Sequence, residues 1–235
     1  MNHARPLIAL ARMLDYPEAE MRGHTSEFLE AAGELAAGDD DEAFESLRSL
    51  GTHLEYTDLL DLQAEYVETF DRGRSTSLNL YEHLYGDGRG RGPAMADLAS
   101  RYEHAGLHMT ARQLPDFLPV FLEYASTLNE PDAREALYRM ATALIGIATA
   151  LERRKSPWLA AVVSVLRFAG IMPWRSAGKK ASPEFAETSA PDWAPGALDA
   201  AWTEEPIQFL GAADPCRPVG RGRESSINGA DHGSE

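Results

Sequence analysis

The sequence has 235 residues, of which 44% are hydrophobic and 25% are charged, so it can bury a core of the size found in a globular domain. Its formal net charge of −15, from 22 basic and 37 acidic residues, argues against nucleic acid and against a stable association with an anionic membrane. The single cysteine, Cys216, excludes an internal disulfide and a cysteine-based metal site, and it suits a reducing compartment. The longest apolar stretch, residues 141–151, is too short to span a membrane, and the N-terminus lacks the apolar core of a signal peptide, so we expect a cytoplasmic protein.

The pattern of apolar residues predicts an all-α protein. Apolar positions recur at spacings of three and four along most of the chain, and no alternating strand pattern persists. We expect helices at about residues 6–15 and 21–37, one with its apolar face at positions 44–54, one from 58 to 73, a short one at 76–84, one from 93 to 106, one capped by Asp116, the longest at 131–154, and one with its apolar face at 158–166. The prediction is a single-domain bundle of about eight to ten helices with a Pro/Gly-rich, partly disordered C-terminal tail.

The composition changes after Gly170, because seven of the 14 prolines follow it. We therefore predict an all-helical domain over residues 1–170. Residues 171–210 are expected to form an extended segment that packs on this domain and contains one short helix at 196–202. Residues 211–235 have the composition of a disordered tail.

Patterns that carry chemistry are weak. His104 and His108 stand four residues apart, but Gly106 lies between them and no third ligand is evident, so we predict no metal site. The glycine-rich loop at 86–92 lacks the preceding strand and the following Lys-Ser/Thr of a phosphate-binding loop. No nucleophile motif is present either. We predict no catalytic residue.

Residues 66–124 concentrate aromatic, acidic and arginine side chains on short helical pieces. One interpretation is a groove that holds an amphipathic helix of a partner, to which an acidic protein would attract basic residues. The side chains expected to seat its apolar side are Tyr66, Phe70, Tyr81, Phe121 and Tyr124. Those expected to meet its basic residues are Glu82, Asp116 and Glu123, with Arg72 bracing the turn into residues 81–83. The simpler interpretation, which spacing alone favours, is that the aromatic residues are core and the carboxylates are caps or surface.

Five stretches occur together in one order along the chain: residues 66–78, Tyr81-Glu82-His83, 91–98, 114–124 and 198–207. They resemble the nitrate reductase molybdenum cofactor assembly chaperones, the NarJ family, which is related to the TorD-like chaperones of other molybdoenzymes. The resemblance extends from about residue 7 to 209. Relatives often carry histidine after the Pro-Asp of the 114–124 stretch, whereas this chain has Phe117, so a role for that histidine does not transfer.

The resemblance implies an all-helical protein without enzymatic activity. It implies a chaperone that binds the apo catalytic (alpha) subunit of respiratory nitrate reductase in the cytoplasm, mainly through the N-terminal segment of that subunit. The chaperone keeps the subunit competent for insertion of the molybdenum cofactor and the Fe–S cluster before membrane docking. It would bind no cofactor stably, and the proteins that make the molybdenum cofactor would be further partners.

Two other hypotheses stay open at this stage. A chaperone of the same kind could proofread the signal peptide of an exported twin-arginine molybdoenzyme, and exchange of the client peptide would separate the two. A small protein that carries a cofactor or hydrolyses nucleotides belongs to another class. Purified material free of molybdopterin and metal, without phosphate release, would exclude it.

Overall fold

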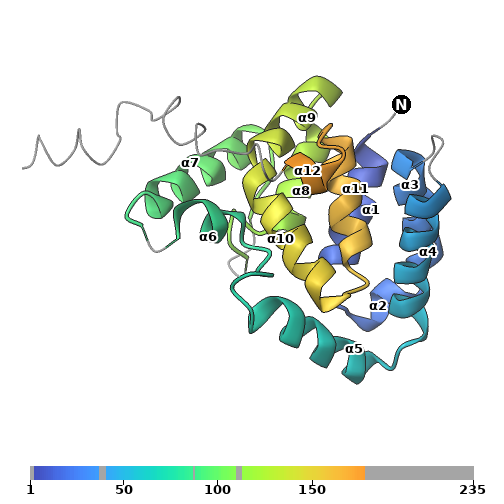
Figure 1. Ribbon diagram of the computed structural model, residues 1–235. Helices are drawn as coiled ribbons and strands as arrows, with labels where there is room; N and C mark the ends of the chain where they lie inside the picture. The colour runs from blue at the N-terminus through green and yellow to red at the C-terminus, as the bar shows by residue number, and fades with distance from the viewer. Residues whose placement is uncertain (1–2, 37–40, 87, 110–112, 178–235) are drawn as a thin grey trace, which may run out of the picture.

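The computed structural model describes residues 3–36, 41–86, 88–109 and 113–177, and Figure 1 shows these residues folded into packed helices. In chain order the elements are α1 (Ala4–Leu14), α2 (Ala19–Arg22), α3 (Thr25–Ala36), α4 (Asp41–Tyr56), α5 (Leu59–Tyr66), the π-helical turn η1 (Val67–Asp71), α6 (Leu80–Tyr85), α7 (Arg91–His104), α8 (Leu118–Thr127), α9 (Glu130–Arg139), α10 (Ala141–Arg154), α11 (Leu159–Phe168) and α12 (Trp174–Ala177). The predicted all-α class is confirmed. No helix within these ranges is long and apolar enough to cross a membrane.

The first helix lies at the centre of the core. Helix α1 is apolar around most of its circumference, and it packs against α3, α8 and α11. It ends where the sequence predicts, because the residue before Pro17 disfavours the helical region. The Tyr66 hydroxyl donates a hydrogen bond of 3.0 Å to the Leu14 carbonyl, which satisfies one of the free carbonyls at the end of α1.

Helices α3 and α4 form a closely packed antiparallel pair at one side of the molecule (Figure 1). Glycines permit the close approach, since a Cβ atom on Gly51 would lie 2.6 Å from Cγ of Leu29. The expected single helix at 21–37 is wrong in one respect. It is divided into α2 and α3 at Gly23 and His24, because the chain must turn there to lay α3 against α1.

The expected longest helix, 131–154, is also divided. Met140 has φ −91° and ψ 8° and ends α9, and α10 begins at the next residue. The apolar spacing of three and four continues through the break, so periodicity could not reveal it. The break lets α9 pack on α8 while α10 packs on α6 and α11.

The short helix expected at 76–84 begins later, at Leu80. Residues 74–76 form a turn, and Asn79 is extended and forms an isolated antiparallel bridge with Phe117. Backbone bonds from Leu118 N–H to the Leu78 carbonyl (2.8 Å) and from Leu80 N–H to the Asp116 carbonyl (2.9 Å) hold the two segments together. This pairing depends on residues far apart in sequence, which local propensity cannot show.

The described chain continues past Gly170 into the core. Ile171 and Trp174 are buried, and α12 packs against α10. The helix expected at 196–202 and the tail expected at 211–235 lie outside the described residues, and the domain boundaries at 170 and 210 stay predictions.

Candidate functional site

Three of the predicted contact residues meet at the start of α6. The fully buried carboxylate of Asp116 accepts a hydrogen bond of 3.1 Å at Oδ2 from the backbone N–H of Tyr81. Arg91 approaches the same oxygen at 3.4 Å and reaches Oε1 of Glu82 at 3.3 Å. Asp116 was expected to cap the helix that follows it. It instead caps α6, and α8 begins after Phe117 without a side-chain cap.

The environment of Asp116 opposes its ionisation. Burial raises the pKa of this carboxyl, while the Tyr81 N–H and the Arg91 guanidinium pull the pKa down by smaller amounts. Its second oxygen, Oδ1, is buried and has no hydrogen-bond partner among the described residues. Asp116 therefore works as a buried tether between α6 and α8, not as an exposed anion for a partner's basic residue.

The aromatic residues of α8 belong to the same buried cluster. Phe121 is 2% exposed, and Tyr124 is half-buried against Tyr102, with ring centroids 4.8 Å apart. The Tyr102 hydroxyl donates a hydrogen bond of 2.7 Å to the Pro115 carbonyl. These rings fill the space between α7 and α8.

A second aromatic cluster lies behind α5 and η1. Tyr66 and Phe70 pack at centroid distances of 6.0 and 5.5 Å from the ring of Trp158, and both are nearly fully buried. The expected surface groove is therefore not formed by Tyr66, Phe70, Tyr81 and Phe121, because their side chains are core. Spacing could not separate the two possibilities, since an apolar face looks the same in sequence whether it meets the core or a partner.

The remaining predicted residues, the half-buried Glu123 and the exposed Arg72, lie apart from one another in the fold. Glu123 on α8 pairs with Arg12 on α1 at 3.0 Å. Arg72 follows η1 and pairs with Glu68 at 2.9 Å. Neither pair joins the Asp116 cluster.

The structure exposes an apolar strip on α5 that apolar spacing alone does not distinguish from a core face. Leu60, Ala64 and Val67 share the face opposite the buried Leu62 and Tyr66, and the Leu60 side chain is 75% exposed. A hollow of about 450 Å³ opens at this strip. It is lined by Tyr16, Gln63, Ala64, Val67, Glu68 and Arg72, so Arg72 is the predicted residue that belongs to it. We call the strip and the hollow together the α5 surface.

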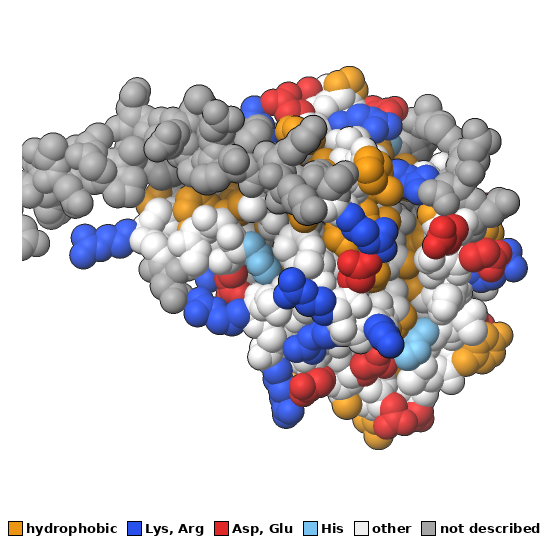
Figure 2. All heavy atoms as spheres, viewed as in Figure 1, with side chains coloured by type: hydrophobic (Ala, Val, Ile, Leu, Met, Phe, Trp, Pro, Cys, Tyr) orange, Lys and Arg blue, Asp and Glu red, His pale blue; other side chains and the backbone are white. Residues whose placement is uncertain are grey.

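Acidic side chains run along one flank of the α5 surface. Asp58 accepts a hydrogen bond of 2.9 Å from the Leu60 N–H and begins the helix, and Asp61, Glu68 and Asp71 follow on its exposed side. Helix α5 lies along the lower edge of the molecule in Figure 1, and Figure 2 shows hydrophobic and acidic side chains next to one another at that rim. The sequence feature that could have indicated this surface is a helix with apolar residues on both of its faces and acidic residues beside one of them.

The side chains of the α5 surface are mostly apolar and acidic, with Arg72 at one end. Over the described ranges, no group of three or more His, Cys, Asp or Glu side chains is placed to hold a metal ion. His104 bonds through Nδ1 to the Ser100 carbonyl of its own helix at 2.6 Å. An exposed apolar strip beside carboxylates is suited to a helix that carries apolar residues on one side and basic residues beside them.

Comparison with known proteins shows what the chain is similar to. The family model described as nitrate reductase delta subunit matches residues 36–164. The nitrate reductase molybdenum cofactor assembly chaperone NarJ of Escherichia coli (strain K12) is 37% identical over 207 residues, which are 87% of this chain and 84% of that protein. The same strain's probable nitrate reductase molybdenum cofactor assembly chaperone NarW is 41% identical over 152 residues, 65% of this chain and 64% of NarW. The probable nitrate reductase molybdenum cofactor assembly chaperone NarJ of Bacillus subtilis (strain 168) is 28% identical over 148 residues, which are 63% of this chain and 79% of that protein.

Proposed function

This chain belongs to the nitrate reductase delta subunit family, and from that premise we propose that it is an assembly chaperone, not a catalyst, for the catalytic (alpha) subunit of a respiratory nitrate reductase. The names of the relatives support a role in molybdenum cofactor assembly of nitrate reductase. The chaperone holds the apo subunit in the cytoplasm and keeps it competent for insertion of the molybdenum cofactor and the Fe–S cluster. It then releases the subunit for docking at the membrane.

The observation that carries the proposal is the α5 surface. Leu60 stands at one end of an apolar strip that continues through Ala64 and Val67 to the hollow, and contiguous exposed apolar surface of this kind marks a candidate binding site. The acidic flank selects a basic occupant, and the formal charge of −15 attracts such an occupant over a longer range. We place the N-terminal segment of the alpha subunit there, bound as an amphipathic helix.

The buried predicted residues have a supporting role in this proposal. Tyr66 and Phe70 pack against Trp158 directly behind α5, so they fix the position of the helix that carries the strip. Arg72 lines the hollow and contacts the client directly. Tyr81, Glu82, Asp116, Phe121, Glu123 and Tyr124 hold the rest of the scaffold and do not touch the client.

The cofactor is delivered to the client and is not held by the chaperone. The chaperone prevents premature docking while the proteins that make the molybdenum cofactor load the alpha subunit. Those proteins are therefore expected to act on the complex of chaperone and client.

Calorimetric titration tests the proposal. The purified chain is titrated with a peptide that copies the N-terminus of the same organism's nitrate reductase alpha subunit, and a twin-arginine signal peptide serves as the control. We expect one-to-one binding of the first peptide alone, weakened by salt because the acidic flank contributes. Binding of the twin-arginine peptide alone would replace this proposal with the proofreading hypothesis, and binding of neither would reject a peptide site on α5.

A further inference from the structure

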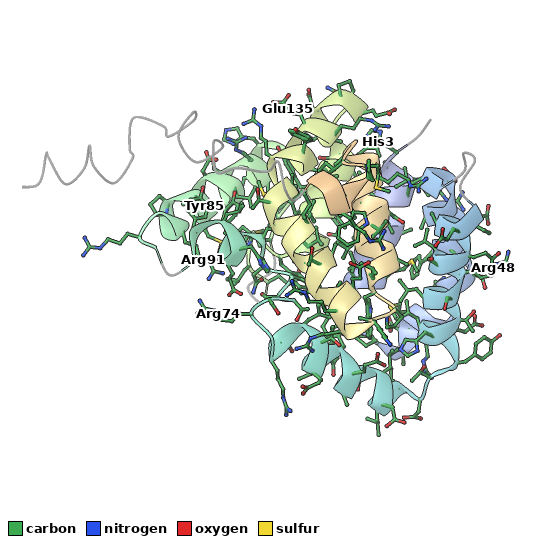
Figure 3. All side chains as sticks on the ribbon, viewed as in Figure 1. His3, Arg48, Arg74, Tyr85, Arg91 and Glu135 are labelled. Atoms are coloured by element: carbon green, nitrogen blue, oxygen red, sulfur yellow. The ribbon has the colours of Figure 1, made fainter. Side chains whose placement is uncertain are left out.

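A basic face interrupts the surface of this acidic protein. Six cations gather where the C-terminal end of α10 meets η1 and the turn after it: Arg72, Arg74, Arg153, Arg154, Lys155 and Arg175. Arg154 joins the two elements by donating a hydrogen bond of 3.1 Å to the Glu68 carbonyl. Arg175 on α12 extends the face to the end of the described chain through an ion pair of 2.6 Å with Glu152. Figure 2 shows several Lys and Arg side chains over this part of the molecule, and Figure 3 shows Arg74 at its border.

Fewer carboxylates than cations are described around this face. Glu68 pairs with Arg72 and Glu152 pairs with Arg175, while Asp71 is the third carboxylate in the neighbourhood. Arg153 and Lys155 are exposed and form no ion pair with a described residue. Cations at the end of a helix are ordinarily explained by the helix dipole. That explanation also covers Arg72 at the end of η1 and Arg175 in the last turn of α12, taken one helix at a time. It does not account for the three helix ends meeting on one face, where Arg154 reaches Glu68 and Arg175 reaches Glu152.

The same chain contains an acidic segment of matching size. Residues 181–210 contain six carboxylates and no lysine or arginine. The carboxylates are Glu184, Glu187, Asp192, Asp199, Glu204 and Glu205. This stretch begins four residues beyond Ala177, the end of α12. Four extended residues reach about 13 Å, and Arg175 already touches α10, so the start of the segment is within reach of the basic face.

We propose that residues 181–210 dock on the basic face of the same molecule. Attachment to α12 gives the segment an effective concentration on the order of millimolar, so contacts that would be weak between separate molecules are sufficient. Because Glu68 and Arg72 line the hollow of the α5 surface as well as the edge of the basic face, the docked segment would lie next to that surface. The docking itself is independent of the identity of the client.

Paramagnetic relaxation tests the docking in the full chain. Cys216 is the single cysteine, so the variant Ala200→Cys with Cys216→Ser carries one nitroxide in the middle of the acidic segment. We expect loss of amide signal for Gly73 and for Arg153 to Lys155 at about 0.1 M salt. The loss should vanish near 1 M salt, where the Debye length falls from about 10 Å to about 3 Å.

A charge reversal and a matched control complete the test. Arg153→Glu combined with Lys155→Glu should abolish the broadening without unfolding the chain, because both side chains are exposed. Arg48→Glu on α4, an exposed arginine outside the basic face, should leave the broadening unchanged. Docking within one molecule would be overturned by broadening that survives the double reversal or that falls on other amides. It would also be overturned if, in a mixture of nitroxide-labelled and unlabelled chains, the label on one chain broadens the amides of another.

Discussion

The carboxylate of Asp116 caps α6 through a hydrogen bond of 3.1 Å with the backbone N–H of Tyr81, which lies 35 residues earlier in the sequence. Tyr81 is the second residue of α6, so its N–H has no partner within the helix. The bridge between Asn79 and Phe117 places the carboxylate at that position. One buried acid thereby joins α6 to the segment that leads into α8.

Asp116→Asn should change how stability depends on pH. The folded-state pKa of Asp116 is raised, so the stabilisation from this group is complete below the usual carboxyl pKa and declines as pH rises through the raised value. The variant keeps a hydrogen-bond acceptor for Tyr81 but cannot ionise. Between the usual carboxyl pKa and the raised one, we expect the free energy of unfolding of the variant, relative to that of the natural chain, to rise with pH. Urea unfolding from about pH 4 to pH 8 measures it.

Asp97→Asn is the matched control, because the Asp97 carboxylate is exposed on α7 and pairs with Arg101 on the surface. Its difference from the natural chain should stay nearly constant with pH. A slope of opposite sign for Asp116→Asn would mean that the attraction to Arg91 outweighs the desolvation of the buried carboxylate.

Leu60→Ser should weaken binding of the alpha-subunit peptide without loss of stability. Burying a leucine side chain against a partner contributes about 1.5–3 kcal/mol, so we expect the Kd to rise about tenfold or more in calorimetry. Tyr138→Ser removes another exposed apolar side chain, on α9 at the opposite end of the molecule (Figure 1), and should leave the Kd unchanged. Equal Kd values for both variants would show that the peptide binds elsewhere.

Gly51→Ala and Gly146→Ala should shift stability in opposite directions. Alanine is about 1 kcal/mol more favourable than glycine inside a helix. At Gly51 the new methyl group would lie 2.6 Å from Cγ of Leu29, and such overpacking costs about 1–3 kcal/mol. At Gly146 the nearest atom is Nδ1 of His83, at 4.0 Å, so nothing has to move. Thermal melts should show a lower Tm for the first variant and a higher Tm for the second.

Tyr102→Phe should destabilise the fold by about 1 kcal/mol, because it removes the hydroxyl that donates to the Pro115 carbonyl. The loss is measured by chemical denaturation. Tyr56→Phe, at a tyrosine that is 75% exposed, should have no measurable effect. Equal stabilities for Tyr102→Phe and the natural chain would mean that water replaces the lost donor at the Pro115 carbonyl.

Local signals in the sequence were sufficient for the all-helical class and for several helix ends. Asp58 begins α5, Pro17 prevents the extension of α1, and Gly86 ends α6 with φ 56°, as turn and cap chemistry predicts. The family resemblance could also be recognised from the sequence, because the order of its motifs along the chain does not depend on what their side chains contact. These features depend on neighbours along the chain.

Placement in three dimensions could not be read in the same way. The spacing of Tyr66 and Phe70 is that of any apolar helix face, and only the packing of Trp158 against them shows that this face is core. The same packing turns Leu60 outward, which makes α5 the candidate binding helix. The sequence by itself determined the all-helical class, several helix ends and which family the chain resembles, because these follow from local order along the chain. Only the tertiary structure decided which apolar face is left for a partner and which helix Asp116 caps, because both depend on contacts between residues distant in sequence.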